Sequence, residues 1–337
     1  MSVASVGEML TRHRDWRVDL GALQESLVFI IGDPEFALGP VALGSERGRE
    51  YAPVFEALSR AIGVHLQSES AVPSLSRRQP AETIRRFALE VDGVRFRVQH
   101  VHGQRYHIRI TSDLREAAEL GLSGAVAEEL FGPRLSSGGL VIVCGNYGSG
   151  KTSAVNAAIR QRIRLYGGYA LVMGDPIEYR YGGHHGTNSR PGYVEQVDLQ
   201  GRDLMAEVRA SMRNFPSGGV SMLGWPELIG SEGVGELLRA STRGSLVFAD
   251  MHALSIEAAI ANILALASQD GESAGRVLLS QSIRLIVHLG SPTAVTGYRA
   301  MPRLQVFGTR ERTVLGDESI SLGNALRAIT SREGQAG

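Results

Sequence analysis

The sequence contains one cysteine, one lysine and no long apolar run. The single cysteine, Cys144, excludes an internal disulfide and a zinc site built from cysteines. Because a membrane-spanning helix requires about 20 consecutive apolar residues, we expect no transmembrane segment. Residues 1–19 also lack the apolar stretch of a secretory signal peptide. The formal net charge is zero, which argues against a protein that coats nucleic acid but leaves room for a local basic patch.

The lone lysine is the most informative residue. Of the 35 lysine and arginine residues, 34 are arginine, and the exception is Lys151, in Gly145-Asn-Tyr-Gly-Ser-Gly-Lys-Thr152. Loops of the form G-x-x-x-x-G-K-[ST] surround a polyphosphate with backbone N–H groups, and their lysine places a compact charge on the phosphates. The planar guanidinium of arginine does not suit that position. The segment therefore predicts a nucleotide site, with the hydroxyl of Thr152 as a Mg²⁺ ligand.

The residues around this loop have the pattern that the motif requires. Residues 139–144 form a short apolar run of the buried-strand kind, and residues 152–165 have apolar positions at helical spacing without Pro or Gly. Strand, glycine loop and helix follow one another in the expected order. The residues expected to bind the nucleotide are Gly145, Asn146, Tyr147, Gly148, Ser149, Gly150, Lys151, Thr152 and Ser153.

The part of the chain before the loop has an α+β pattern. We expect a strand at residues 27–31, a helix at 51–62, a loop at 67–80 and a helix at 114–131. Residues 87–91 and 94–98 flank Asp92-Gly93, a strong hairpin signal, and a second turn near Gly103 leads to a third strand at 106–110.

From residue 139 onward, strands alternate with helices. Strands are predicted at 169–173, 220–223 and 245–249, and helices at 204–212, 234–240 and 256–267. The segment 276–286 is either a second helix or a strand, and residues 310–337 are weakly patterned. Such alternation is typical of a mainly parallel sheet covered on both faces.

Four motifs follow one another along the chain: the strand and loop at 139–152, Gly174-Asp-Pro-Ile-Glu178, residues 208–213, and Gly244-Ser-Leu-Val-Phe-Ala-Asp-Met-His252. In this order and spacing they resemble the secretion ATPase superfamily of type II secretion, type IV pili and type IV secretion. The resemblance is strongest to pilus-retraction and conjugation-type members. The second motif is similar to the family's acidic "Asp box", the third to the helix before its Walker B strand, and the fourth to its "His box".

The resemblance implies an α/β fold in which a PAS-like α+β domain precedes a RecA-like P-loop ATPase domain with a mainly parallel sheet. We place the first domain at residues 1–120, the second at 121–310 and a C-terminal tail at 311–337. The implied protein binds ATP and Mg²⁺ and assembles into a ring, usually a homo-hexamer. It would act in the cytoplasm, at the inner face of the cytoplasmic membrane, on an inner-membrane platform protein, without stable binding to nucleic acid.

The resemblance also implies roles for five residues outside the loop. Arg105 and Arg109 match family arginines that reach the phosphates, and they share one face of their strand at period two. Asp175 and Glu178 follow a strand end, where ligands bind in open α/β sheets, and we expect Asp175 to contribute to the metal site. His252, at the tip of another strand, is expected to sense the γ-phosphate.

One departure from the family pattern concerns hydrolysis. The family's Walker B strand ends in Gly-Glu, and that Glu activates the water, whereas here Trp225 stands in its place. An indole has no group that accepts a proton. Glu227 or Glu178 is a candidate replacement. The alternative is a subunit that binds nucleotide without efficient hydrolysis, in a structural or regulatory role in the same machine. A RecA-like DNA motor is a further alternative, which the zero net charge disfavours.

Overall fold

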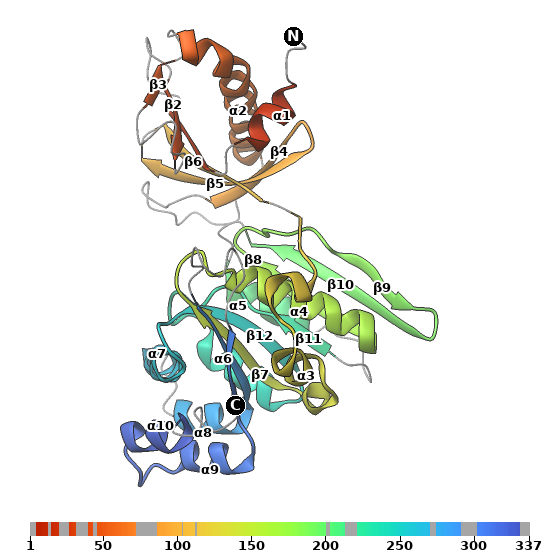
Figure 1. Ribbon diagram of the computed structural model, residues 1–337, viewed down its shortest axis with the longest axis vertical. Helices are drawn as coiled ribbons and strands as arrows, with labels where there is room; N and C mark the ends of the chain where they lie inside the picture. The colour runs from red at the N-terminus through yellow and green to blue at the C-terminus, as the bar shows by residue number, and fades with distance from the viewer. Residues whose placement is uncertain are drawn as a thin grey trace. The chain divides into compact units, whose positions relative to one another are not determined.

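The computed structural model describes residues 5–12, 15–19, 27–31, 40–42, 46–71, 86–102, 104–111, 113–199, 203–212, 221–269, 274–290 and 302–330. The chain forms two compact units, shown in Figure 1. Unit 1 comprises Met1–Asp113 together with Asp175–Tyr179, and unit 2 comprises Leu114–Gly174 and Arg180–Gly337. Contacts thus divide the chain after Asp113, slightly before the boundary expected from the sequence, and they group the segment 175–179 with the N-terminal unit.

Unit 1 is an antiparallel sheet with two helices. Its elements are α1 (Val6–Thr11), β1 (Asp15–Asp19), β2 (Leu27–Ile31), β3 (Pro40–Ala42), α2 (Glu46–Ala71), β4 (Arg86–Val91), β5 (Val94–His102) and β6 (Arg105–Ile110), and its strands have the order β3-β2-β1-β6-β5-β4. The predicted helix face of Val54, Leu58 and Ile62 is buried in one cluster with Phe96 and Ile108 of the sheet. Burial of this face is therefore what holds α2 on the sheet.

The three-stranded meander predicted from the sequence is confirmed. β4 pairs with β5, and β5 with β6, both antiparallel. Asp92 and Gly93 have φ values of 48° and 76°, as a two-residue hairpin turn with two left-handed positions requires.

Two expectations in the first 131 residues were wrong. Residues 67–71, expected in a loop, continue α2, since residues 67–72 contain neither Pro nor Gly. The single helix expected at 114–131 is instead a 3₁₀ helix, η1 (Ala117–Leu120), followed by α3 (Ala125–Phe131). Gly121 and Gly124 between them have φ values of 79° and 56°, which a right-handed helix does not accommodate.

Unit 2 is a mixed sheet of eight strands in the order β14-β13-β7-β12-β11-β8-β10-β9. Its elements after α3 are η2 (Pro133–Ser137), β7 (Gly139–Gly145), α4 (Lys151–Tyr166), β8 (Gly168–Gly174), β9 (Gly183–Thr187), β10 (Arg190–Asp198), α5 (Leu204–Met212), β11 (Ser221–Gly224), α6 (Val234–Thr242), β12 (Leu246–His252), α7 (Ile256–Gln269), α8 (Gly275–Ser282), β13 (Ile283–Leu289), β14 (Pro302–Val306), α9 (Thr309–Gly316) and α10 (Leu322–Thr330). The six central strands are parallel, and the edge strands β14 and β9 are antiparallel to their neighbours. The expected α/β fold with a mainly parallel sheet is confirmed.

Helices cover both faces of this sheet, with α4 lying across one of them (Figure 1). On the other face, Leu140, Ile142 and Cys144 of β7 pack in a cluster with residues from α5, α6, α7 and α8. Burial raises the pKa of the Cys144 thiol to about 12, so this cysteine remains protonated near neutral pH and has a packing role.

Parts of unit 2 were missed or left open by the sequence. The β9–β10 hairpin was not predicted, because its glycines and histidines give no apolar alternation. The segment left open at 276–286 is a helix followed by a strand, α8 and β13. The weakly patterned residues at 310–337 contain most of α9 and all of α10, whose Leu315, Leu326 and Ile329 join the unit 2 core.

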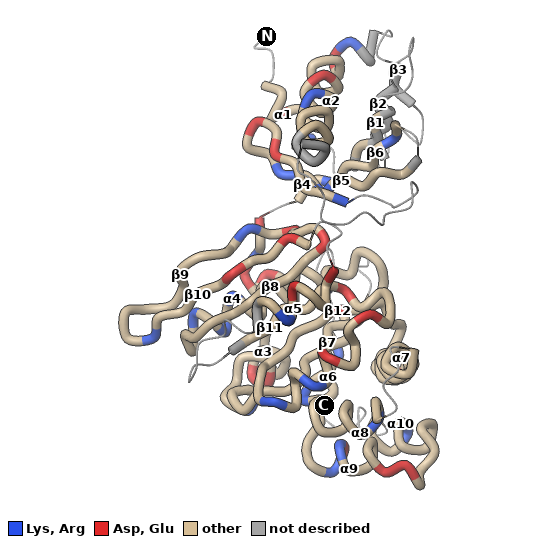
Figure 2. The backbone as a smooth tube through the Cα atoms, turned by 180° about the vertical axis from the view of Figure 1, so that it is seen from behind, with Lys and Arg blue, Asp and Glu red and all other residues tan. Residues whose placement is uncertain are grey.

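Charged residues of both signs occur along unit 2. Figure 2 shows cationic and anionic residues interspersed along its described backbone, without a large region of one sign. None of the helices in the described ranges combines the length and the apolarity that crossing a lipid bilayer requires.

Candidate functional site

The phosphate loop leaves β7 at the carboxyl end of the sheet and enters α4. Gly148 and Gly150 have φ values of 73° and 89°, and Gly150 is the N-cap of α4. A Cβ atom built on either glycine would stand in open space, with nothing within 4 Å. The two glycines therefore leave open space beside the backbone at the N-terminus of a 16-residue helix, an arrangement suited to an anion.

Lys151 is 6% exposed, and its ammonium lies among acceptors of the protein itself. Nζ donates to the carbonyl oxygen of Asn146 at 3.0 Å and lies 3.1 Å from Nδ1 of His252. A buried ammonium needs such partners, because its desolvation is otherwise costly. The loop lysine and the "His box" histidine, which are 101 residues apart in sequence, thus meet at one point.

The partners of His252 determine its tautomer. An ammonium only donates, so Nδ1 of His252 must accept from Lys151. On the other side of the ring, Nε2 lies 2.9 Å from the Oε1 atom of Glu227, and an ionised carboxylate only accepts. The neutral imidazole with its proton on Nε2 satisfies both contacts. Lys151, His252 and Glu227 therefore form a chain of three side chains in close polar contact.

Tyr147 covers this chain from the solvent side. Its ring centroid lies 3.6 Å from that of His252, with the planes inclined by 34°, and 5.9 Å from Nζ of Lys151. Although Tyr147 is 86% exposed, these two contacts hold its ring against the histidine. The ring reduces water access to the imidazole and adds a weak cation–π attraction to the lysine.

Thr152 contacts Asp250, a residue that was not predicted to belong to the site. Its hydroxyl lies 2.7 Å from Oδ2 of Asp250, which is 2% exposed. Asp250 was part of the quoted "His box" segment, but only His252 was singled out there. The available signal was an acidic residue inside the apolar strand Leu246–His252, since aspartate is almost never fully buried without a partner.

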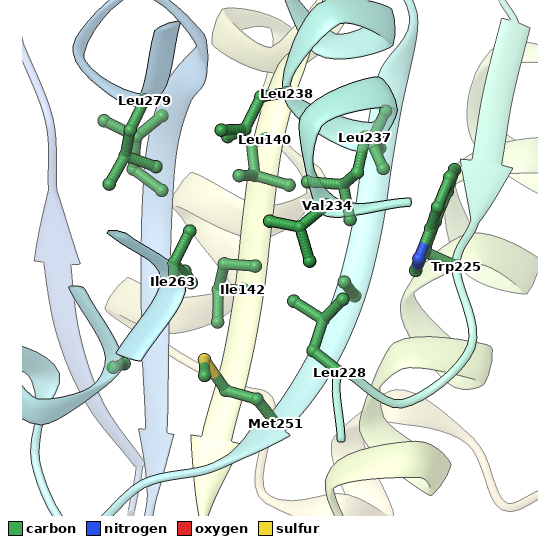
Figure 3. Close-up of a cluster of buried hydrophobic side chains, with 14 of the residues drawn as sticks. Leu140, Ile142, Trp225, Leu228, Val234, Leu237, Leu238, Met251, Ile263 and Leu279 are labelled. Atoms are coloured by element: carbon green, nitrogen blue, oxygen red, sulfur yellow. The ribbon is translucent and has the colours of Figure 1, made fainter. Parts of the chain in front are cut away.

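Trp225 does not face the phosphate loop. Its backbone N–H donates to the carbonyl of Phe248 at 2.7 Å, and its side chain is 3% exposed within the core cluster of unit 2. Figure 3 shows the indole at the edge of that cluster, beside Leu237 and Val234 of α6. A Cβ atom added to Gly233 would come within 2.9 Å of the ring, which shows how closely the helix start packs on it.

We expect Trp225→Glu to destabilise the protein without accelerating hydrolysis. The change removes a large buried side chain and places a charge in an apolar cluster, at a cost of about 3–5 kcal/mol or more. Chemical denaturation followed by circular dichroism measures this loss, and Trp225→Phe, which keeps an apolar ring, should lose much less. A stable Trp225→Glu protein with faster turnover would place the end of β11 in the catalytic site instead.

Glu178 is held within unit 1. Its carboxylate forms an ion pair with Arg97 of β5, and Arg95, two residues earlier, donates to the carbonyl of Ile177 at 2.7 Å. These contacts explain why the segment 175–179, which contains Asp175, groups with unit 1. In this structure, Glu178 is engaged by an arginine, whereas Glu227 is engaged by the histidine that contacts Lys151.

Arg105 and Arg109 also belong to unit 1. Both are exposed on β6, and the intervening Tyr106 and Ile108 are buried, so the predicted alternation along this strand is correct. The residues that the structure brings together at the phosphate loop all belong to unit 2: Asn146, Tyr147, Lys151, Thr152, Glu227, Asp250 and His252.

The oxygens beside the loop have the chemistry of a Mg²⁺ site. Mg²⁺ prefers oxygen ligands and is usually bound by one or two protein groups together with substrate phosphates and water. Thr152 and Asp250 supply a hydroxyl and a carboxylate next to the glycines of the loop. Within the described ranges, no three His, Cys, Asp or Glu side chains gather in a way that could hold a metal ion. A hydroxyl and a carboxylate fit an ion whose other ligands come from nucleotide phosphates and water.

Comparisons with known proteins agree with this architecture. The type IV pilus retraction ATPase PilT of Pseudomonas aeruginosa is 26% identical over 231 residues, which cover 66% of this chain and 63% of that protein. The ATPase DotB of Legionella pneumophila has a similar fold, with a TM-score of 0.62 at 17% identity over 97% of this chain and 86% of that one. A structure of the pilus retraction motor PilT with bound ADP has a TM-score of 0.64 at 21% identity, over 96% of this chain and 89% of that chain.

The family assignment rests on a match that spans both units. Residues 50–303 match the family described as Type II/IV secretion system protein. This range includes the hairpin of unit 1, the phosphate loop, the "Asp box" and the "His box", so the resemblance inferred from the four motifs is confirmed. The chain belongs to the Type II/IV secretion system protein family, within the secretion ATPase superfamily.

Proposed function

We propose that the chain binds Mg-ATP at residues 145–153, hydrolyses it, and works as a subunit of a ring-forming motor in a type IV secretion, conjugation or type IV pilus machine. The observation that supports this proposal is the chain of contacts from Lys151 through His252 to Glu227, beside the phosphate loop. It joins a phosphate-binding cation, an imidazole of defined tautomer and a carboxylate.

Binding requires an exchange of partners at Lys151. Its ammonium leaves the Asn146 carbonyl and Nδ1 of His252 and donates to the β- and γ-phosphates of ATP. The backbone N–H groups of the loop and the N-terminus of α4 stabilise the same negative charge. Because the lysine is already desolvated, ATP gains a strong charge-assisted contact without the full cost of burying a new cation.

Bound Mg²⁺ would supply positive charge next to the transferred phosphoryl group. On the protein side, the hydroxyl of Thr152 is the group placed to hold the ion, and this hydroxyl contacts the carboxylate of Asp250.

Release of Lys151 frees Nδ1 of His252. A neutral imidazole whose Nε2–H donates to Glu227 has the form of a general base, because the carboxylate fixes the tautomer and stabilises the imidazolium that forms. His252 would take the proton of the attacking water, and Glu227 would act through His252. In this chain the pair takes over the role that the missing glutamate at position 225 has in the family.

The ring and its location rest on the family. Arg105 and Arg109, exposed on unit 1, would complete the site of a neighbouring subunit in a homo-hexamer, where guanidinium groups neutralise phosphate charge. The ring would act in the cytoplasm, at the inner face of the membrane, against a platform protein. Asp175 would contribute to the metal site across the same interface.

A second candidate function has an observation of its own. Trp225 directly follows β11 and is buried in the core, so no acidic side chain projects from that position. A subunit that binds ATP without efficient turnover would have a structural or regulatory role in the same machine.

Turnover and assembly separate these candidates. We expect the full chain to bind Mg-ATP in calorimetry, to release phosphate, and to form oligomers in light scattering whose fraction rises with nucleotide. Binding without phosphate release would establish the second candidate. A monomer at high concentration with ATP would contradict the ring, and the absence of any nucleotide binding would contradict the proposal as a whole.

A further inference from the structure

The carboxylate of Asp250 is unusual in its surroundings. It is the only aspartate or glutamate among the described residues that is buried, and the residues before it in β12 are apolar. A buried carboxylate is strongly unfavourable unless hydrogen bonds or a cation compensate it. The position of this group next to a phosphate loop therefore calls for a chemical explanation.

The backbone holds Asp250 firmly. β12 lies next to β7, with Asp250 opposite Val143, and on its other side the Asp250 carbonyl accepts from the N–H of Leu228 at 2.8 Å. The side chain points to the sheet face on which α4 begins, since it reaches the hydroxyl of Thr152 at 2.7 Å. A residue fixed on both edges of its strand presents its carboxylate in a defined direction.

The direction of this hydrogen bond matters for a metal ion. An ionised carboxylate only accepts, so the hydroxyl of Thr152 donates its proton to Asp250 and keeps both lone pairs as acceptors. In loops of this type the threonine hydroxyl is a Mg²⁺ ligand. A carboxylate that takes the proton of that hydroxyl orients the lone pairs and adds negative charge close to the ion.

We infer that Asp250 is the acidic positioning residue for nucleotide-bound Mg²⁺ in this chain, acting through Thr152. This inference rests on the proposed function of the loop as a nucleotide site. It moves the principal acidic metal partner from the "Asp box", where the sequence analysis placed Asp175, to the strand directly beside the loop. It also gives unit 2 an acidic group of its own beside the loop, although the end of β11 carries Trp225.

The inference predicts a specific effect on nucleotide binding. Without metal, the negative charge of Asp250 repels phosphates, so its removal should leave metal-free binding unchanged or make it tighter. With Mg²⁺, the same removal should reduce the gain in affinity that the metal provides by about 10–100-fold, the usual effect of losing such a supporting carboxylate. A role limited to folding would weaken both kinds of binding alike.

The experiment measures the dissociation constant of a fluorescent ADP analogue on the full chain, with excess Mg²⁺ and with EDTA. Asp250→Asn keeps the shape and an oxygen that accepts from Thr152 but removes the charge. We divide the dissociation constant of the ADP analogue in EDTA by its value in Mg²⁺. For Asp250→Asn we expect this ratio to be about 10–100-fold smaller than for the native protein. Glu318→Gln, which removes an exposed carboxylate, should leave the ratio unchanged.

The outcomes separate this inference from the function on which it rests. If the native protein shows a Mg²⁺ gain and Asp250→Asn retains all of it, the inference is wrong and the nucleotide site stands. If the native protein binds no nucleotide in either condition, the proposed function fails. If Asp250→Asn does not fold, the same ratio of dissociation constants is measured on Asp250→Thr. Threonine is neutral and is favoured in strands.

Discussion

Replacing Lys151 with alanine is expected to weaken Mg-ATP binding by roughly 30-fold to more than 1,000-fold. The change removes the ammonium that the loop presents to the phosphates, and the loss of one partner from a buried charge pair costs about 2–5 kcal/mol. No other lysine exists in the chain to compensate. Isothermal titration calorimetry of the purified variant measures the effect directly.

Two further variants define the cause of that loss. Lys151→Arg keeps the charge but replaces a compact ammonium with a planar fork, so it should also bind weakly. Arg243→Ala removes a largely exposed cation that pairs with Glu236, and the variant should bind ATP like the native protein. The Lys151 ammonium contacts Asn146 and His252, which both belong to the site, so thermal unfolding of Lys151→Ala should change little. Native affinity in a folded Lys151→Ala protein would refute the phosphate-loop assignment.

The sequence was most informative where one local pattern determines the structure. The lone Lys151 and its glycines located the loop, because phosphate binding needs both at fixed spacing. Asp92-Gly93 located the hairpin for a similar reason, since few residues adopt two left-handed positions in succession. Strands and helices of unit 2 followed from their apolar periodicity, which burial in a covered parallel sheet requires.

The sequence was less informative where contacts join residues far apart in the chain. Nothing local indicates that Glu227 meets His252, or that Thr152 donates to Asp250, because these pairs form only when parallel strands place their carboxyl ends side by side. Trp225 illustrates the opposite case. The alignment of motifs put it at a catalytic position, but the side chain turns into the core.

The arrangement around His252 also constrains the order of events in the proposed cycle. While Lys151 donates to Nδ1 of His252, the imidazole lacks a free acceptor for the proton of water. In the proposed cycle, phosphate binding would remove the lysine from that nitrogen. The base would therefore become available only when nucleotide occupies the loop, which couples binding to catalytic competence within unit 2.

Replacing Glu227 with glutamine is expected to lower the rate of ATP hydrolysis by about 10²–10⁴-fold, with the dissociation constant for ATP nearly unchanged. Glutamine retains the shape and one acceptor oxygen, but it removes the negative charge that stabilises the imidazolium and fixes the tautomer. The effect should appear in the turnover number, because Glu227 contacts His252 and not the loop backbone. Phosphate release under saturating ATP measures it, and Glu232→Gln, an exposed change five residues along the chain, is the matched control.

A double-mutant comparison tests whether Glu227 works through His252. If the two side chains act as one unit, His252→Ala should cost about as much as Glu227→Gln, and the double variant should lose little more, since groups that act together are strongly non-additive. Independent roles would instead multiply the two losses. Glu178→Gln, which breaks the ion pair with Arg97 in unit 1, is expected to reduce turnover less than Glu227→Gln. Loss of turnover in Glu178→Gln, with native turnover in Glu227→Gln, would transfer the catalytic role to the "Asp box" and refute the assignment of Glu227 and His252 as the base.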